Sequence, residues 1–130
     1  MIRYNYTRQV SPPAPFVYLT LSCVQTGREL WQQPAQIDTG ADRTVIPKTL
    51  VEELGLVPLD EVPVSGFSGE VLLLQTYCLQ VQIHNFAPKQ TEVIAHASQP
   101  FILLGRDLLN QFRIVLDGPQ LFLEIAAQES

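Results

Sequence analysis

The stretch Asp38-Thr39-Gly40-Ala41-Asp42 follows the apolar approach Pro34-Ala35-Gln36-Ile37. This order predicts a carboxylate at the end of a buried strand, on a tight turn where glycine lets the backbone bend. Gly40 leaves its backbone N–H free to point at the Asp38 carboxylate, and the small Ala41 leaves room beside it. The motif occurs once in the chain, so the chain carries one carboxylate in this setting.

A second segment further along the chain is expected to pack against the first. It reads Phe101-Ile102-Leu103-Leu104-Gly105-Arg106-Asp107, an apolar strand that ends in a glycine. We expect Leu103, Leu104 and Gly105 to run behind the Asp38 turn, because glycine allows two backbones to approach closely.

Composition narrows the classes of protein. Of the 130 residues, 46% are apolar and 16% charged, which is typical of one folded domain. The net charge is −5 without a Lys/Arg cluster, so we expect no nucleic-acid partner and no anionic membrane surface. The apolar runs fall short of the roughly 18 residues of a membrane span. The N-terminus resembles no signal peptide, which predicts a cytoplasmic protein.

The rest of the chain indicates an all-β domain over residues 16–130. Residues 1–15 are polar and then Pro-rich, and we expect an extended arm or tail outside the core. Short alternating segments, such as 16–24 and 79–83, are typical of half-buried strands in a barrel or sandwich. Pro47 and Gly55 bracket a short helix, and a second one is expected near 107–111.

A hairpin with a glycine-rich tip is expected in the middle of the chain. Strands over 59–65 and 70–74 flank the tip Gly66-Phe67-Ser68-Gly69. An exposed phenylalanine at a tip favours a binding role over an ordinary surface hairpin, although both interpretations stay open.

Taken together, the two segments resemble the retropepsin family of retroviral-type aspartic proteases. The resemblance covers roughly residues 16–125 and is closer to the cellular and bacterial members, because those have a helix after the first segment. It implies a closed acid-protease-like barrel of short strands with a flap hairpin and one or two short helices. It also implies that the chain is one half of a twofold dimer.

The resemblance implies a catalytic turn of Asp38, Thr39 and Gly40. Peptide hydrolysis of this kind needs two carboxyls that share one proton across a water, and two carboxyls about 3 Å apart cannot both ionise. The second Asp38 would come from a twofold-related copy. The substrate is then a peptide or protein. No metal or cofactor is needed, and His84 and His96 lack ligand spacing.

Further site residues follow from the same resemblance. Substrate would contact Ala41, Asp42 and the flap residues Gly66, Phe67, Ser68 and Gly69. Two roles of Asp42 stay open. One is a structural ion pair with Arg106, which we favour, and the other is a backbone contact to bound peptide.

The C-terminal hairpin suggests that strands within 113–125 form the dimer interface. A rival interpretation is a non-catalytic peptide-binding or dimerisation module on the same fold. The intact Asp-Thr-Gly argues against it, because nothing structural demands aspartate at position 38. A third interpretation is a monomeric, zymogen-like form held by the Pro-rich arm.

Overall fold

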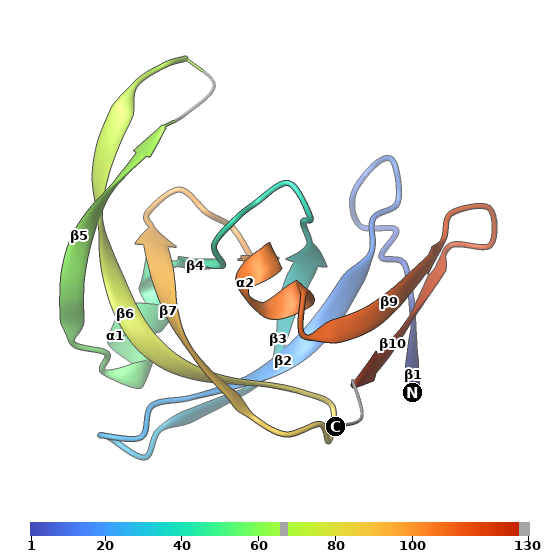
Figure 1. The fold of residues 1–130 in the computed structure, drawn as a ribbon, viewed down its shortest axis with the longest axis horizontal. Helices are drawn as coiled ribbons and strands as arrows, with labels where there is room; N and C mark the ends of the chain where they lie inside the picture. Colours follow the sequence, from blue (N-terminus) through green and yellow to red (C-terminus); the bar gives the residue numbers. More distant parts are fainter. Residues whose placement is uncertain (66–67, 128–130) are drawn as a thin grey trace.

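The structure, a computed structural model, describes residues 1–65 and 68–127. These residues form strands and two short helices (Figure 1). The strands are β1 (Ile2–Asn5), β2 (Phe16–Ser22), β3 (Glu29–Ile37), β4 (Val45–Pro47), β5 (Pro58–Ser65), β6 (Val71–Ile83), β7 (Lys89–His96), β8 (Ile102–Leu104), β9 (Phe112–Asp117) and β10 (Phe122–Ala127). The helices are α1 (Lys48–Leu54) and α2 (Arg106–Leu109).

Most of the strands close into a barrel, which confirms the expected fold class. The sheet runs in the order β2-β3-β8-β4-β7-β6-β5, and a further pairing of β2 with β6 closes six of these strands into a ring. The alternation predicted for the second strand is present, since Val17, Leu19 and Leu21 are buried. Their side chains fill the barrel together with those of the other strands, so burial of apolar surface stabilises the closed form.

The long strand β6 differs from the expectation of two separate short strands. It runs unbroken from Val71 to Ile83. Its first half pairs with β5 and its second half with β7 and β2. The polar pair Gln75-Thr76 interrupts the apolar alternation, but Thr76 is buried where β6 enters the barrel. The β5–β6 hairpin therefore rises from the barrel wall, on the same side as the loop after β3 (Figure 1).

Helix α1 follows its predicted boundaries closely. Pro47 is the N-cap, and Gly55 closes the helix with φ of 68°. Its N–H donates to the Glu52 carbonyl oxygen at 3.2 Å, and the Leu56 N–H donates to the Val51 carbonyl oxygen at 3.0 Å. A left-handed glycine with these two bonds is the usual stop for a helix.

The N-terminal residues do not form the free arm that the sequence predicted. Strand β1 pairs antiparallel with β10, in register Ile2↔Ile125, and completes a three-stranded sheet β1-β10-β9. Ile2, Tyr4 and Tyr6 pack against the core, and burial raises the pKa of the Tyr4 hydroxyl. The alternation of these three side chains is a strand pattern that the nearby prolines obscured.

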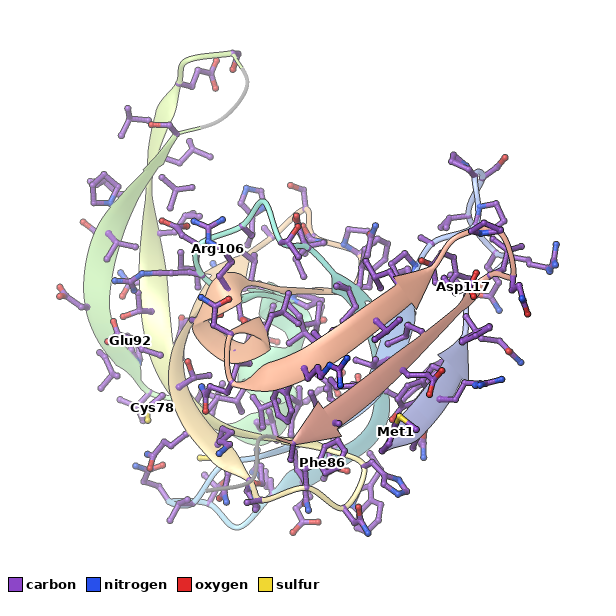
Figure 2. The ribbon with its side chains drawn as sticks, turned by 45° about the vertical axis from the view of Figure 1, so that its right-hand side comes forward. Met1, Cys78, Phe86, Glu92, Arg106 and Asp117 are labelled. Atoms are coloured by element: carbon purple, nitrogen blue, oxygen red, sulfur yellow. The ribbon has the colours of Figure 1, made fainter. Side chains whose placement is uncertain are left out.

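The small sheet is tied to the barrel by aromatic contacts. Phe86, in the β6–β7 turn, lies 5.8 Å from Phe112 of β9 between ring centroids, and Tyr4 lies 6.2 Å from Tyr18 of β2. Figure 2 shows Phe86 beside the small sheet and Asp117 at the far end of β9.

Within the described residues, none of the helices has the length and hydropathy to span a membrane.

Removal of the Tyr4 side chain tests whether β1 belongs to the folded domain. Tyr4→Ala should lower the free energy of unfolding by about 1–2 kcal/mol, because a half-buried ring loses its contacts. Asn5→Ala is the matched control on the exposed face, with an expected change under about 0.5 kcal/mol. Urea unfolding measures both. Equal, small changes would mean that β1 does not stabilise the fold.

Candidate active site

Asp38 lies directly after β3, where the chain turns away from the barrel. β3 pairs parallel with β8, in register Ile37↔Leu104, and the Asp38 N–H donates to the Leu104 carbonyl oxygen at 3.0 Å. The Asp38 side chain is half-buried. Strand β8 therefore lies beside the end of β3 and fixes the point at which the aspartate leaves the sheet.

The turn that follows is closed by its own hydrogen bonds. The Gly40 N–H donates to Asp38 Oδ1 at 3.1 Å, and the Ala41 N–H donates to the Asp38 carbonyl oxygen at 3.2 Å. Thr39 and Gly40 are exposed. The turn thus presents the carboxylate at the surface in one orientation, with a backbone donor already bound to one of its oxygens.

Gly105 makes the close approach that its place in the sequence predicted. A Cβ atom at this position would lie 2.5 Å from the Arg43 carbonyl carbon and 2.7 Å from its oxygen. The next residue adds a backbone bond, because the Arg106 N–H donates to the Ala41 carbonyl oxygen at 2.9 Å. The chain after β8 therefore packs directly against the backbone of the Asp38 loop.

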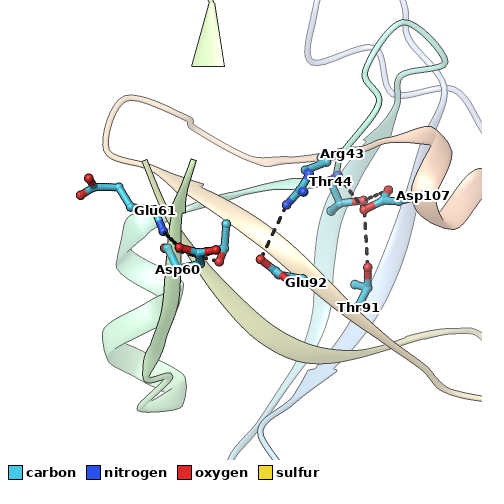
Figure 3. Close-up of polar contacts among 8 residues, drawn as sticks. Arg43, Thr44, Asp60, Glu61, Thr91, Glu92 and Asp107 are labelled. Atoms are coloured by element: carbon cyan, nitrogen blue, oxygen red, sulfur yellow. Dashed lines mark hydrogen bonds and ion pairs between the residues drawn. The ribbon is translucent and has the colours of Figure 1, made fainter. Parts of the chain in front are cut away.

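A partly buried polar network, which the sequence analysis did not single out, holds the same two segments together (Figure 3). The Thr44 hydroxyl donates to Asp107 Oδ1 at 2.7 Å, and the Thr44 N–H donates to Asp107 Oδ2 at 3.0 Å. The Thr44 hydroxyl oxygen also accepts the Gly105 N–H at 3.1 Å. Thr44 is only 1% exposed, so each of these polar groups is satisfied inside the protein.

The expected ion pair between Asp42 and Arg106 is wrong. Arg106 Nη1 donates to the Thr39 carbonyl oxygen at 2.8 Å instead. Within residues 1–65 and 68–127, the ion pairs are Arg3–Glu124 and Arg43–Glu92. The turn places this carbonyl oxygen within reach of the guanidinium, and at an exposed position water can solvate the remaining donors. Asp42 and Arg106 are both exposed.

The Asp38 turn opens into a cleft of about 900 Å³ under the β5–β6 hairpin. Besides Asp38, its lining residues are Gly40, Ala41, Asp42, Arg43, Val45, Val62, Pro63, Val64, Ser65 and Ile94. The lining combines aliphatic with charged side chains, which suits an extended chain with mixed side chains.

Of the predicted flap tip, the described residues include Ser68 and Gly69. Ser68 and Gly69 are exposed and lie outside the lining of the cleft, whereas Gly66 and Phe67 fall outside the described residues. In the described part of the chain, no three His, Cys, Asp or Glu side chains gather as a metal site would require.

Substitution of Gly105 tests the close approach of the two backbones. Gly105→Ala should lower the free energy of unfolding by about 3 kcal/mol, because the new methyl group meets backbone that cannot rotate away. At Gly118 an added Cβ meets no atom within 4 Å, so Gly118→Ala is the matched control. Thermal or urea unfolding compares the two. Similar effects at both positions would contradict a tight contact at Gly105.

Thr44→Val tests the buried network, since valine keeps the shape and removes the hydroxyl. The Gly105 N–H and the Asp107 carboxylate then lose a partner, at an expected loss of about 2 kcal/mol. Thr91→Val is the control. Its hydroxyl is 3.5 Å from Asp107 Oδ2, at the limit of a hydrogen bond, so its loss should destabilise the protein less than Thr44→Val does. A larger effect of Thr91→Val in denaturant unfolding would show that Thr44 is not the central member.

Comparison with solved structures gives the same fold at low sequence identity. A retropepsin-like aspartic protease from Rickettsia conorii aligns with a TM-score of 0.63 and 20% identity, over 97% of this chain and 90% of that one. The retroviral protease-like domain of Ddi1 from Leishmania major aligns with a TM-score of 0.52 and 18% identity, over 85% and 88%. The EIAV protease gives 0.51 and 19%, over 80% and 91%.

Sequence comparison gives the family. Residues 31–111 match the family model described as "gag-polyprotein putative aspartyl protease". The Gag-Pro polyprotein of Human T-cell leukemia virus 2 is 38% identical over 95 residues, which are 67% of this chain and 15% of the polyprotein. The chain thus spans a small part of that relative. Because the match covers the Asp38 turn, the cleft wall and β8, the chain belongs to the retropepsin-like family of aspartyl proteases.

Proposed function

We propose that this chain is one protomer of a homodimeric aspartic endopeptidase in which Asp38 of each copy supplies one carboxyl group. The observation that carries the proposal is the half-buried Asp38 carboxylate at the floor of a cleft, held by a Gly40 N–H at 3.1 Å. A peptide bound in the cleft would lie between the Asp38 turn and the β5–β6 hairpin. Family membership supports the same chemistry.

The reaction needs the two carboxyls in different protonation states. The ionised one takes a proton from a water while the water oxygen attacks the peptide carbonyl carbon, and the neutral one gives its proton to the carbonyl oxygen. The resulting tetrahedral species then loses its C–N bond as the nitrogen takes the proton that the first carboxyl received from the water, while a hydroxyl of the species returns its proton to the second carboxylate. Because the residues themselves exchange every proton, the step needs no metal ion.

A second copy supplies the missing carboxyl through twofold symmetry. The Asp38 loop, the β5–β6 hairpin, the loop before β2 and the β9–β10 turn all project toward one side of the molecule (Figure 1). The proposed contact of the partner is on this side. Val115 and Leu116 of β9 are 45% and 47% exposed, and burial of such side chains would stabilise a dimer.

Asp38→Asn should abolish cleavage and preserve the fold. The amide has the size of the carboxyl but cannot take the proton of the water. Peptide-library cleavage followed by mass spectrometry measures the activity, and circular dichroism checks the fold. Asp60→Asn, an exposed aspartate on β5 outside the cleft lining, is the control and should cleave like the wild type. Activity of Asp38→Asn within tenfold of wild type would defeat the assignment.

Mixing the wild type with Asp38→Asn tests whether the partner completes the site. Mixed dimers hold one carboxyl, so excess variant should inhibit the wild type in proportion to the fraction of mixed dimers. Dilution alone should also lower specific activity, in step with a dimer-to-monomer transition in sedimentation. A monomeric protein whose specific activity stays the same on dilution and on addition of the variant would exclude this mechanism.

A non-catalytic peptide-binding module on the same fold would give a different outcome. Such a protein would bind peptides in the cleft with no cleavage by the wild type. Binding that is the same for the wild type and Asp38→Asn, without any product, would favour that alternative.

A further inference from the structure

We infer that Arg43 selects substrates, by receiving an acidic side chain of the peptide close to the cleaved bond. The inference rests on the proposed function, because it concerns the same cleft. Arg43 lines the cleft together with Asp38, which places its cationic side chain beside the proposed reaction centre.

The backbone of Arg43 is held in a fixed place. Gly105 packs against its carbonyl group, so closely that a Cβ at Gly105 would lie 2.5 Å from the Arg43 carbonyl carbon. The next residue, Thr44, is buried and bound to Asp107 through both its N–H and its hydroxyl. The Arg43 side chain therefore starts from a rigid point of the loop, as a specificity residue must.

The guanidinium group of Arg43 has hydrogen-bond donors that the described residues do not use. Arg43 Nη1 lies 3.7 Å from Glu92 Oε2, which is too long for a hydrogen bond, and both side chains are 43% exposed. Figure 3 shows Arg43 pointing toward Glu92 of β7. Within the described residues no hydrogen bond engages this guanidinium, which has five N–H donors. A second carboxylate has donors to bind on another edge of the group.

The charges of the cleft favour an acidic ligand group at this one position. Among the described residues that line the cleft, Arg43 is the one cation, and Asp38 and Asp42 are the carboxylates. The remaining lining side chains near Arg43 are aliphatic, such as Val45 and Ile94. A glutamate or aspartate of the peptide is therefore repelled elsewhere in the cleft and is bound with charge assistance at Arg43.

Asp42 is the competing feature, because an exposed carboxylate favours a basic side chain instead. Arg43 differs from it in that Gly105 packs directly against its backbone, whereas in the described part of the chain no ion pair holds the Asp42 side chain. A preorganised group loses less freedom on binding. A lysine preference would mean that Asp42, and not Arg43, selects the substrate.

The experiment compares matched peptides. A proteome-derived peptide library first gives a cleaved sequence. This peptide is then synthesised with Glu, Gln or Lys at the position near the cleaved bond where the cleaved peptides are enriched in acidic residues or, without such enrichment, where they accept different residues. At about pH 6 the wild type should show kcat/KM about tenfold higher for the Glu peptide than for its Gln twin. Arg43→Gln should bring this ratio near unity, and Arg43→Glu should shift the preference to Lys.

Two further variants sharpen the outcome. Glu92→Gln removes the competing carboxylate and should raise the Glu/Gln ratio. Lys89→Gln, on the same strand β7 but outside the cleft lining, removes one positive charge and should leave the ratio at the wild-type value. This control separates a contact at Arg43 from a general effect of net charge.

The possible failures are distinguishable. A Glu/Gln ratio that is the same in the wild type and Arg43→Gln, with cleavage intact, overturns the role of Arg43 alone. A preference for Lys in the wild type does the same. No cleavage of any peptide by the wild type overturns the proposed function, and the selection of cleaved substrates with it.

Discussion

The contact on which the rest of the site depends is the packing of Gly105 against the backbone of Arg43. Two chain segments far apart in sequence meet there with no side chain between them. The Thr44–Asp107 network then locks the same junction with partly buried hydrogen bonds, and the Arg106 N–H adds a backbone hydrogen bond to the Ala41 carbonyl oxygen. The Asp38 loop is thus fixed to the barrel at both of its ends, and the exposed Gly40 N–H then orients the carboxylate. Rigid support of this kind is what a preorganised site requires.

Much of this arrangement could be predicted from the sequence, because its parts have local patterns. An apolar strand before Asp-Thr-Gly, and an apolar strand that ends in Gly105, each follow from residue type and order. The helix between Pro47 and Gly55 follows from capping chemistry in the same way. Closure into a barrel followed from the number of short alternating strands and from the resemblance.

The rest depends on contacts that no local pattern encodes. Thr44 and Asp107 are separated by 63 positions, and neither residue stands out in its own segment. The partner of Arg106 was mispredicted for a related reason, since both a carboxylate and a carbonyl oxygen lie in the same loop and only the geometry selects one. Strand β1 was missed because Pro12, Pro13 and Pro15 dominated the interpretation of a segment whose first residues alternate as a strand. Its partner, β10, lies at the other end of the chain.

The contacts that hold Asp38 within one chain bear on the free energy of dimer assembly. Contacts within the chain position Asp38: the Gly40 N–H and the Leu104 carbonyl oxygen are its hydrogen-bond partners, and Gly105 packs against the loop that follows. If dimerisation supplies the second carboxyl, it therefore does not have to order the first. Association then costs the translational and rotational entropy of two rigid bodies and little conformational entropy. More of the favourable interaction free energy at the interface therefore appears as affinity. Under the proposed function, the fold of the protomer and the activity of the dimer are thus separable properties. Substitutions in the Thr44–Asp107 network act on the first, whereas changes on the side that faces the partner act on the second.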